Sequence, residues 1–146
     1  MKKTNAPIVV PTDGSKASLT AIEELLPLLA WFKEPAVLAL IHVHEKIPYS
    51  RAVAWIGTDA AQRYYDEESN AALEPGAALL EGAGVSFEKV RRVGDPAHEI
   101  VAFTGEWKGD VVAIGRHGHS ALEKLLLGSV AQKVVAASAV PVLLLA

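Results

Sequence analysis

Two glycine-containing segments in the last third of the chain have the residue types and the spacing to bind a phosphate group. The first is Gly115-Arg116-His117-Gly118, and nine residues separate it from the second, Gly128-Ser129. Glycine lets main-chain N–H groups approach an anion closely, because no Cβ stands in the way. A helix that begins at the second segment adds unpaired N–H donors and a partial positive charge. The pattern therefore predicts a site for a nucleotide or another phosphate-bearing ligand.

The same residues also fit ordinary helix punctuation, with no ligand involved. Ser120-x-x-Glu123 matches a capping box, residues 122–127 have the composition of a short helix, and Gly128 would end that helix. On spacing alone, both interpretations stay open. The segment matches neither the P-loop pattern nor G-x-G-x-x-G, so those two fingerprints do not apply.

The elements that must position these glycines alternate along the chain between apolar strands and helices. Apolar runs predict strands at residues 8–10, 36–43, 111–114 and 140–145, and an alternating pattern predicts a less buried strand at residues 85–93. Helical patterns predict helices at residues 15–29, 59–83, 96–107 and 130–137. Ser15 or Ser18 can cap the first helix, and Asp95 can cap the third. This order predicts an α/β fold, an open parallel sheet with helices on both faces.

Proline and glycine are expected to disturb two of these helices. Pro27 should kink the first helix, because proline lacks an N–H and clashes one turn back. The Pro75-Gly76 pair should bend or split the second helix, and Gly82 should help to end it. Residues 45–58, which contain Pro48 and Gly57, are expected to be irregular.

Two loops compete for the place where such a sheet binds its ligand. Open parallel sheets bind ligands outside the carboxyl ends of their strands, where the strand order reverses. Residues 11–15 (Pro-Thr-Asp-Gly-Ser) follow the first strand, and the first glycine segment follows the fourth. If these two strands are neighbours, both loops face one crevice. Asp13 could cap the helix near Ser15, or contact the ligand or a bound Mg²⁺, and the two roles can coexist.

The composition argues against several kinds of partner and site. The 146 residues carry a net charge of −3 without a basic stripe, which argues against nucleic acid as a partner. There is no cysteine, hence no disulfide and no thiolate metal site. Pro7, Pro11 and Asp13 break up any signal-peptide core, and no apolar run approaches the ~20 residues that span a bilayer. We expect one domain over residues 1–146, in the cytoplasm and away from membranes.

Two histidine pairs lie at the predicted carboxyl ends of strands, where a metal could bind. They are His42-x-His44 and His117-x-His119, and imidazole is a zinc ligand. No carboxylate in the sequence evidently completes either set. We therefore expect His117 to belong to the ligand loop rather than to a transition-metal site, and His98 to lie on a helix surface.

The glycine pattern and several dispersed segments resemble the universal stress protein family. Gly115-x-x-Gly118, nine residues, and Gly128-Ser129 are similar to the family's nucleotide signature. Further similar segments follow in the family's order, at residues 10–15, 40–43, 93–101, 125–130 and 140–143. The resemblance implies a Rossmann-like, adenine nucleotide alpha hydrolase-like sheet in the order 3-2-1-4-5, a homodimer, and ATP as ligand, to which we add Mg²⁺.

The resemblance also assigns roles to individual residues. The phosphate tail and ribose would lie along Gly115, Gly118, Gly128, Ser129 and Val130, and the rest of the nucleotide along Pro11, Thr12, Asp13 and the main chain of Val43. His117 would belong to the same loop. Arg116 would either counter the phosphate charge or be a solvated loop arginine, and this alternative stays open.

The last apolar strand is expected to form a homodimer contact. Residues 140–145 would lie at a sheet edge, where an uncovered apolar strand promotes aggregation. Pairing with a second copy across a two-fold axis would cover it. The residues predicted at this contact are Val140, Val142, Leu143 and Leu144.

The sequence and the resemblance together favour a binding module over an enzyme. Phosphoryl transfer needs a positioned base or water-orienting group and charge neutralisation at the γ-phosphate. The glycine segment contains no lysine, and no clear general base lies beside it. We expect an ATP-binding regulatory module of the stress response. Two alternatives stay open: a slow Mg²⁺-dependent ATP hydrolase or nucleotidyl transferase that uses Asp13, and a ligand-free dimeric interaction scaffold.

Overall fold

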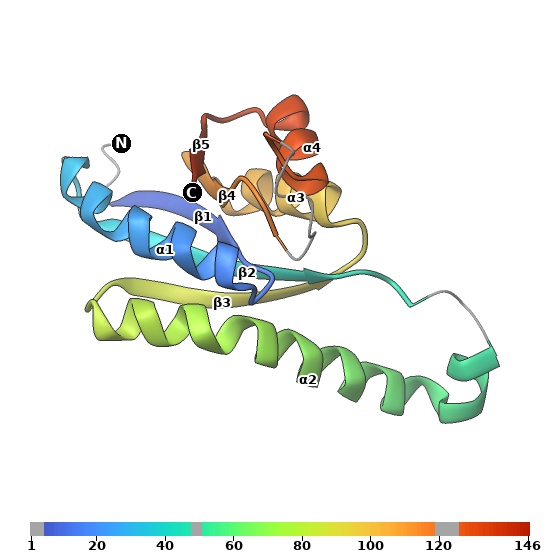
Figure 1. The fold of residues 1–146 in the computed structure, drawn as a ribbon. Helices are drawn as coiled ribbons and strands as arrows, with labels where there is room; N and C mark the ends of the chain where they lie inside the picture. The colour runs from blue at the N-terminus through green and yellow to red at the C-terminus, as the bar shows by residue number, and fades with distance from the viewer. Residues whose placement is uncertain (1–4, 48–50, 119–125) are drawn as a thin grey trace.

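The strands form one parallel sheet in the order β3-β2-β1-β4-β5, which confirms the predicted order (Figure 1). The structure is a computed structural model that describes residues 5–47, 51–118 and 126–146, and only the main chain of residues 51–56. The strands are β1 (Ala6–Pro11), β2 (Ala36–His44), β3 (Ser86–Val93), β4 (Val111–Gly115) and β5 (Val142–Leu145). Because every pairing is parallel, all carboxyl ends lie at one edge of the sheet.

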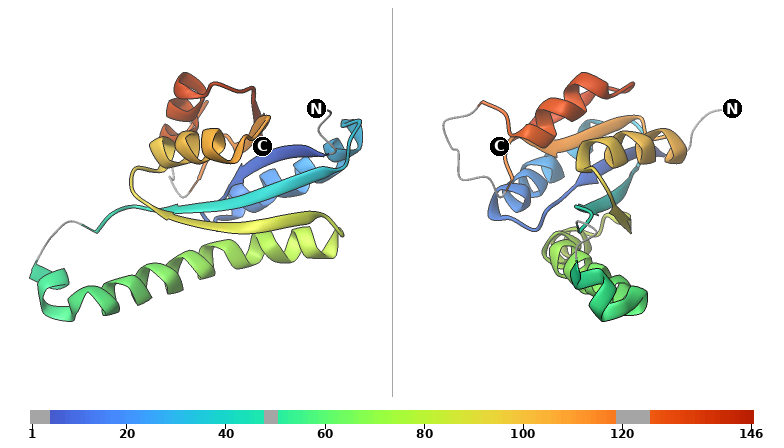
Figure 2. Two further views of the ribbon diagram at one scale, coloured as in Figure 1. Left: turned by 180° about the vertical axis from the view of Figure 1, so that it is seen from behind. Right: turned by 90° about the vertical axis from the view of Figure 1, so that its right-hand side faces the viewer.

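Helices cover both faces of this sheet, as the alternation of elements predicted (Figure 2). They are α1 (Lys16–Leu28), continued by the 3₁₀ turn η1 (Leu29–Trp31), α2 (Arg51–Gly82), α3 (Pro96–Trp107) and α4 (Ser129–Ala137). Helices α1 and α2 pack on one face of the sheet, and α3 and α4 pack on the other. Each face therefore has its own apolar core.

The central strand β1 belongs to both cores because successive side chains of a strand point to opposite faces. Ile8 and Val10 pack in the core beneath α1 and α2, while Val9 packs in the core beneath α3 and α4. All three side chains are at most 2% exposed. Such burial on both faces explains the unbroken apolar run in the sequence.

The predicted helix caps are formed. The Ser15 hydroxyl accepts a hydrogen bond from the Ser18 N–H at 3.2 Å, so Ser15 caps α1. Asp95 caps α3 by accepting from the His98 N–H at 3.0 Å, directly ahead of Pro96. These side chains satisfy N–H groups that the first helical turn leaves unpaired.

Helix α2 differs from its prediction at its start and at the Pro75-Gly76 pair. Residues 51–56 were expected to be irregular, but α2 begins at Arg51, and Gly57, with φ of +77°, interrupts it. The helix also continues to Gly82 without splitting at Pro75-Gly76. Gly76 packs so closely on the core that an added Cβ would lie 3.0 Å from Ile22 Cδ1. This packing on Ile22 of α1 and Leu40 of β2 holds the helix in place directly after the proline.

Some predicted features differ slightly or cannot be described. Pro27 lies one residue before the end of α1, and β5 begins at Val142 rather than at residue 140. The capping box of Ser120 and Glu123, most of the predicted helix at residues 122–127, and His119 lie outside the described residues. Within the described ranges, no helix combines the length and hydropathy needed to cross a membrane.

Candidate functional site

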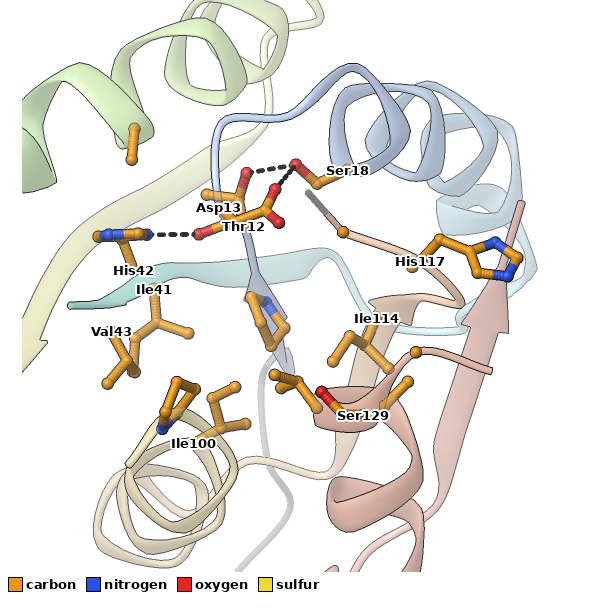
Figure 3. Close-up of a pocket in the computed structure, with 18 of the residues that line it drawn as sticks. Thr12, Asp13, Ser18, Ile41, His42, Val43, Ile100, Ile114, His117 and Ser129 are labelled. Carbon is orange, nitrogen blue, oxygen red and sulfur yellow. Dashed lines mark hydrogen bonds between the residues drawn. The ribbon is translucent and has the colours of Figure 1, made fainter. Parts of the chain in front are cut away.

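A cavity of about 530 Å³ lies at the carboxyl ends of the central strands (Figure 3). Because β1 lies between β2 and β4, the loops that follow these three strands meet there. All eleven residues predicted for the ligand site line this cavity. They are Pro11, Thr12, Asp13, Val43, Gly115, Arg116, His117, Gly118, Gly128, Ser129 and Val130. The structure thus brings the two competing loops together, while ligand binding by these residues stays a prediction.

The loop between β1 and α1 is held by the side chain of Asp13. Its Oδ1 atom accepts hydrogen bonds from the Ser15 N–H and from the Ser18 hydroxyl, both at 2.9 Å (Figure 3 shows the second). Asp13 therefore supports the start of α1 and also lines the cavity. The two roles that the sequence allowed for Asp13 are compatible in one geometry.

Buried hydroxyl groups surround this carboxylate on the side of α1. Thr12 and Ser18 are each 5% exposed, and their hydroxyl oxygens lie 3.1 Å apart. The Ser15 hydroxyl also donates to the Ser18 hydroxyl at 3.3 Å. Sequence analysis considered Ser18 only as a helix cap, yet it lines the cavity. Its spacing of three residues from Ser15, one helical turn, was the available signal.

The loop from β1 also contacts helix α2. Gly14 has φ of +77°, and a Cβ at this position would lie 2.9 Å from Ala72 Cα. Glycine is needed here for both its conformation and this close approach. The contact explains why Ala72 and Glu68 of α2 line a cavity that is otherwise built at the strand ends.

The two glycine segments are joined directly to each other. The Gly128 N–H donates to the Arg116 carbonyl at 2.6 Å, and a Cβ on Gly128 would lie 3.2 Å from the same oxygen. The Arg116 N–H in turn donates to the Leu145 carbonyl at 2.9 Å, which ties the first segment to β5. The two glycine segments, which are nine residues apart in the sequence, therefore lie side by side just beyond the end of β4.

Helix α4 begins at the cavity, so its first N–H groups lie at the cavity wall. Gly128 is its N-cap, and none of the described side chains caps this end. Ser129, Val130 and Ala131, the first three residues of the helix, all line the cavity. An α-helix leaves such N–H groups without intrahelical partners and carries a partial positive charge at this end. This part of the wall is chemically suited to an anion.

The side chains of Arg116 and His117 in the first glycine segment lie at the margin of the cavity. Arg116 is exposed to solvent, and His117 is partly buried. In Figure 3 the His117 imidazole points away from the other labelled side chains. The main chain of this segment therefore offers the closer contacts to a ligand in the cavity.

Apolar side chains form another part of the wall, which sequence analysis did not predict. Ile41, Ile100 and Ile114 lie around the space that Val43 also faces (Figure 3). They come from β2, α3 and β4, and all three are at most 6% exposed. Each also belongs to the core beneath α3 and α4, so nothing in the sequence distinguished them from other core residues. An apolar wall beside main-chain donors suits a flat aromatic ring attached to an anion.

The histidines of β2 make main-chain hydrogen bonds. His42 Nδ1 lies 2.9 Å from the Thr12 carbonyl, and His44 Nδ1 lies 2.7 Å from the Glu45 carbonyl. Among the described side chains, no group of three or more histidine, aspartate or glutamate residues is arranged to hold a metal ion. His98 is exposed on α3, where the sequence placed it.

Comparison of the sequence with known families finds one that spans almost the whole chain. The universal stress protein family matches residues 4–146. Universal stress protein MJ0531 of Methanocaldococcus jannaschii is 34% identical over 136 residues, covering 93% of this chain and 79% of the relative. A universal stress protein of Methanothermobacter thermautotrophicus is 37% identical over 131 residues, covering 88% of this chain and 86% of the relative.

Solved structures share the same architecture. Protein MJ0577 of Methanocaldococcus jannaschii superposes with a TM-score of 0.79 at 26% identity, covering 98% of this chain and 96% of its own. A universal stress protein solved in complex with cAMP superposes with a TM-score of 0.66 at 25% identity and covers 99% of both chains. The sheet order and the helix layers described above are therefore shared with known proteins.

Proposed function

This chain belongs to the universal stress protein family, and we propose that its cavity binds ATP or another adenine nucleotide as a regulatory module of the stress response. The observation that carries the proposal is the cavity itself, which combines main-chain donors with an apolar wall at the strand ends. The relative solved with cAMP supports an adenine nucleotide as the ligand class.

The phosphates would bind where the two glycine segments meet the start of α4. The N–H groups of Ser129 and Val130 lie in the first turn of the helix, and the Ser129 hydroxyl adds a donor. Main-chain donors at a helix start bind phosphate without a basic side chain. This arrangement suits a chain whose net charge is −3. The apolar wall of Ile41, Ile100 and Ile114 would receive the base.

The residues present fit Mg²⁺ that arrives with the nucleotide. Mg²⁺ is usually held by one or two carboxylates together with substrate phosphates and water. Asp13 lines the cavity, and the Ser15 N–H and the Ser18 hydroxyl, which donate to its Oδ1, hold the carboxylate at the cavity wall. When bound, the ion would neutralise phosphate charge, while Asp13 would fix where the phosphates lie.

Calorimetric titration of the purified protein with ATP, ADP and AMP, with and without Mg²⁺, tests this function. We expect ATP to bind most tightly, because its longer phosphate chain reaches more donors at the start of α4. Mg²⁺ should strengthen ATP binding in the wild type and have less effect in Asp13→Asn. No heat of binding at millimolar nucleotide, and no nucleotide in mass spectra of ligands released from freshly purified protein, would exclude the proposal.

Two measurements on the same purified protein, ATP turnover and oligomeric state, distinguish the two alternative functions. Steady ATP turnover that disappears in Asp13→Ala would favour a slow hydrolase, since Asp13 lines the cavity and packs against Gly118 of the proposed phosphate site. An intact dimer without nucleotide affinity would favour an interaction scaffold.

A homodimer through β5 is the second part of the proposal. Strand β5 is the outer strand beside β4, and Val142, Leu143 and Leu144 are only partly buried. An apolar cavity of about 400 Å³ adjoins this strand, lined in part by Val142, Leu143 and Trp31. Trp31 is 81% exposed. A second copy would cover these side chains and pair the open edge of the strand.

Three expectations about location and partners stay predictions. The absence of cysteine favours a reducing compartment, and we propose the cytoplasm. The net charge of −3 disfavours nucleic acid as a partner. Fractionation of cells and a nucleic-acid binding assay at low salt would check these predictions. The third prediction is that the protein works without a membrane partner.

A further inference from the structure

The hydrogen-bond ladder between β1 and β2 continues one residue beyond β1. Pro11 and Ile41 are the last register pair of the two strands. Thr12, the next residue, still donates its N–H to the Ile41 carbonyl at 2.9 Å. Thr12 therefore begins the cavity loop while its main chain remains attached to β2.

The carbonyl group of Thr12 is bonded to a side chain of β2. His42 Nδ1 lies 2.9 Å from this oxygen (Figure 3). A carbonyl oxygen only accepts hydrogen bonds, so Nδ1 must carry the proton. Both main-chain groups of Thr12 are thus held by β2, the N–H by main chain and the C=O by an imidazole.

This bond affects how the loop and β2 face the cavity. In a regular parallel ladder, the N–H of Val43 would be the next donor to the Thr12 carbonyl, because alternate residues of a strand point to the same neighbour. The imidazole of His42 takes the Thr12 carbonyl from the side instead. Val43 and Thr12 both line the cavity at this point. The regular hydrogen bonding between β1 and β2 therefore ends at the cavity wall, where the imidazole replaces a main-chain donor.

We propose that His42 is a positioning residue of the ligand site, which fixes Thr12 and Asp13 and keeps the Val43 main chain available to the ligand. Asp13 is fixed from the other side by its bonds to Ser15 and Ser18. Losing the His42 bond would leave the Thr12 carbonyl less constrained, although the Thr12 N–H would stay bonded to the Ile41 carbonyl. This inference rests on the proposed nucleotide binding, in which His42 would act by holding the residues that contact the ligand.

Three substitutions of His42 distinguish the effect of its hydrogen bond to Thr12 from the effect of its side-chain size. The Asn amide nitrogen can reach the place of Nδ1, whereas the Gln amide nitrogen reaches the place of Nε2, and Ala has no donor. We expect His42→Asn to bind ATP within about twofold of the wild type. His42→Gln and His42→Ala should bind about three- to tenfold more weakly, the range of one neutral hydrogen bond. His98→Ala, which changes an exposed histidine of α3, should bind as the wild type does.

The ranking of these variants decides the proposal. If Asn is as weak as Ala, or if Ala binds as tightly as the wild type, His42 does not position the site. If the wild type itself binds no ATP, the proposed function fails, and this outcome is seen before any variant is compared. Circular dichroism and thermal unfolding of each variant show whether a weak binder has lost its fold.

The ring of His42 gives a readout that does not depend on nucleotide. Long-range proton–nitrogen spectra of the wild type at neutral pH should show the neutral ring protonated on Nδ1, or the imidazolium. A neutral ring protonated on Nε2 would overturn the proposal, because that form cannot donate from Nδ1 to the Thr12 carbonyl.

Discussion

The carboxylate of Asp13 occupies the space that a Cβ atom at position 118 would need. An ideal Cβ built on Gly118 overlaps Asp13 Oδ2, and it would lie 3.5 Å from Asp13 Cγ. The loop that follows β4 thus packs directly against the side chain of the loop that follows β1. Glycine at position 118 serves this contact, in addition to the approach of a phosphate that sequence analysis expected.

Gly118→Ala should therefore destabilise the protein through Asp13. We expect the free energy of unfolding to fall by about 1–3 kcal/mol, since an added carbon must displace a packed group. In the Asp13→Ala background the same substitution should cost less, because the overlapping carboxylate is gone. Urea unfolding of the four proteins gives a coupling energy, expected at about 0.5–3 kcal/mol for groups in contact.

A second glycine provides the control for this cycle. Gly105 lies within α3, and an added Cβ there meets nothing within 4 Å. Gly105→Ala should raise the free energy of unfolding by about 0.5–1 kcal/mol in either background, since alanine favours a helix interior. Equal costs of Gly118→Ala with and without Asp13 would show that the two loops are not coupled in this way.

The sequence predicted the sheet well because each central strand is marked by apolar residues buried on both faces. Val9 and Ala39 are fully buried on one face, and Ile8 and Leu38 on the other, so their runs contain no polar residue. The start of α2 was missed because the residues around it have the types that usually mark a loop. Gly57 and Pro48 look like loop signals, but a glycine of positive φ interrupts a helix here without ending it.

The site was predictable where glycine and aspartate mark it and unpredictable where apolar side chains form it. Gly115, Gly118 and Asp13 follow strands, and the strand order brings their loops to one edge. Ile100 and Ile114 also line the cavity, but each has the same residue type as its neighbours in the core. Only their positions distinguish them, Ile114 near the end of β4 and Ile100 in the second turn of α3, and these positions require coordinates.

Arg116 provides a test of charge at the phosphate site. Its side chain is exposed, so its attraction for phosphate is screened by water and salt. Arg116→Ala should weaken ATP binding by about threefold at low ionic strength, and the difference should vanish near 1 M salt, where screening acts over about 3 Å. Arg63→Ala, which changes an exposed residue of α2, is the matched control. Equal affinities of the wild type and Arg116→Ala at low salt would identify Arg116 as a solvated loop arginine.

A charge in β5 tests the proposed dimer. Val142 is partly buried, pairs with Val112 of β4, and lines the apolar cavity that contains Trp31. Val142→Asp should give monomers or insoluble protein, because an aspartate would be desolvated between two copies. Val135→Asp, on an exposed position of α4, should leave the oligomeric state unchanged. Light scattering after size exclusion measures both, and a soluble dimer of Val142→Asp would contradict the proposed interface.

An ion pair between β3 and α3 gives the folded protein a specific response to acid. The Arg92 guanidinium donates to both carboxylate oxygens of Glu106 and, at 3.4 Å, to Glu99, and its Cζ lies 5.3 Å from the centre of the Phe103 ring. The hydrogen bond from Arg92 holds the pKa of Glu106 below its ordinary value of 4.5. Since folding lowers this pKa, the stabilisation is present above pH 4.5 and is lost as the pH falls through the lower value of the folded state.

Glu106→Gln should therefore unfold at a lower temperature than the wild type at pH 7, and this difference should shrink as the pH is lowered to about 3, below the ordinary range of a glutamate pKa. The effect should be small, because Glu106 is largely exposed. Glu23→Gln, on the exposed surface of α1 and outside this ion pair, should show no such pH-dependent difference. Thermal unfolding followed by circular dichroism at both pH values measures it. A difference between wild type and Glu106→Gln that was as large at pH 3 as at pH 7 would mean that Glu106 stabilises the fold by packing rather than by its charge.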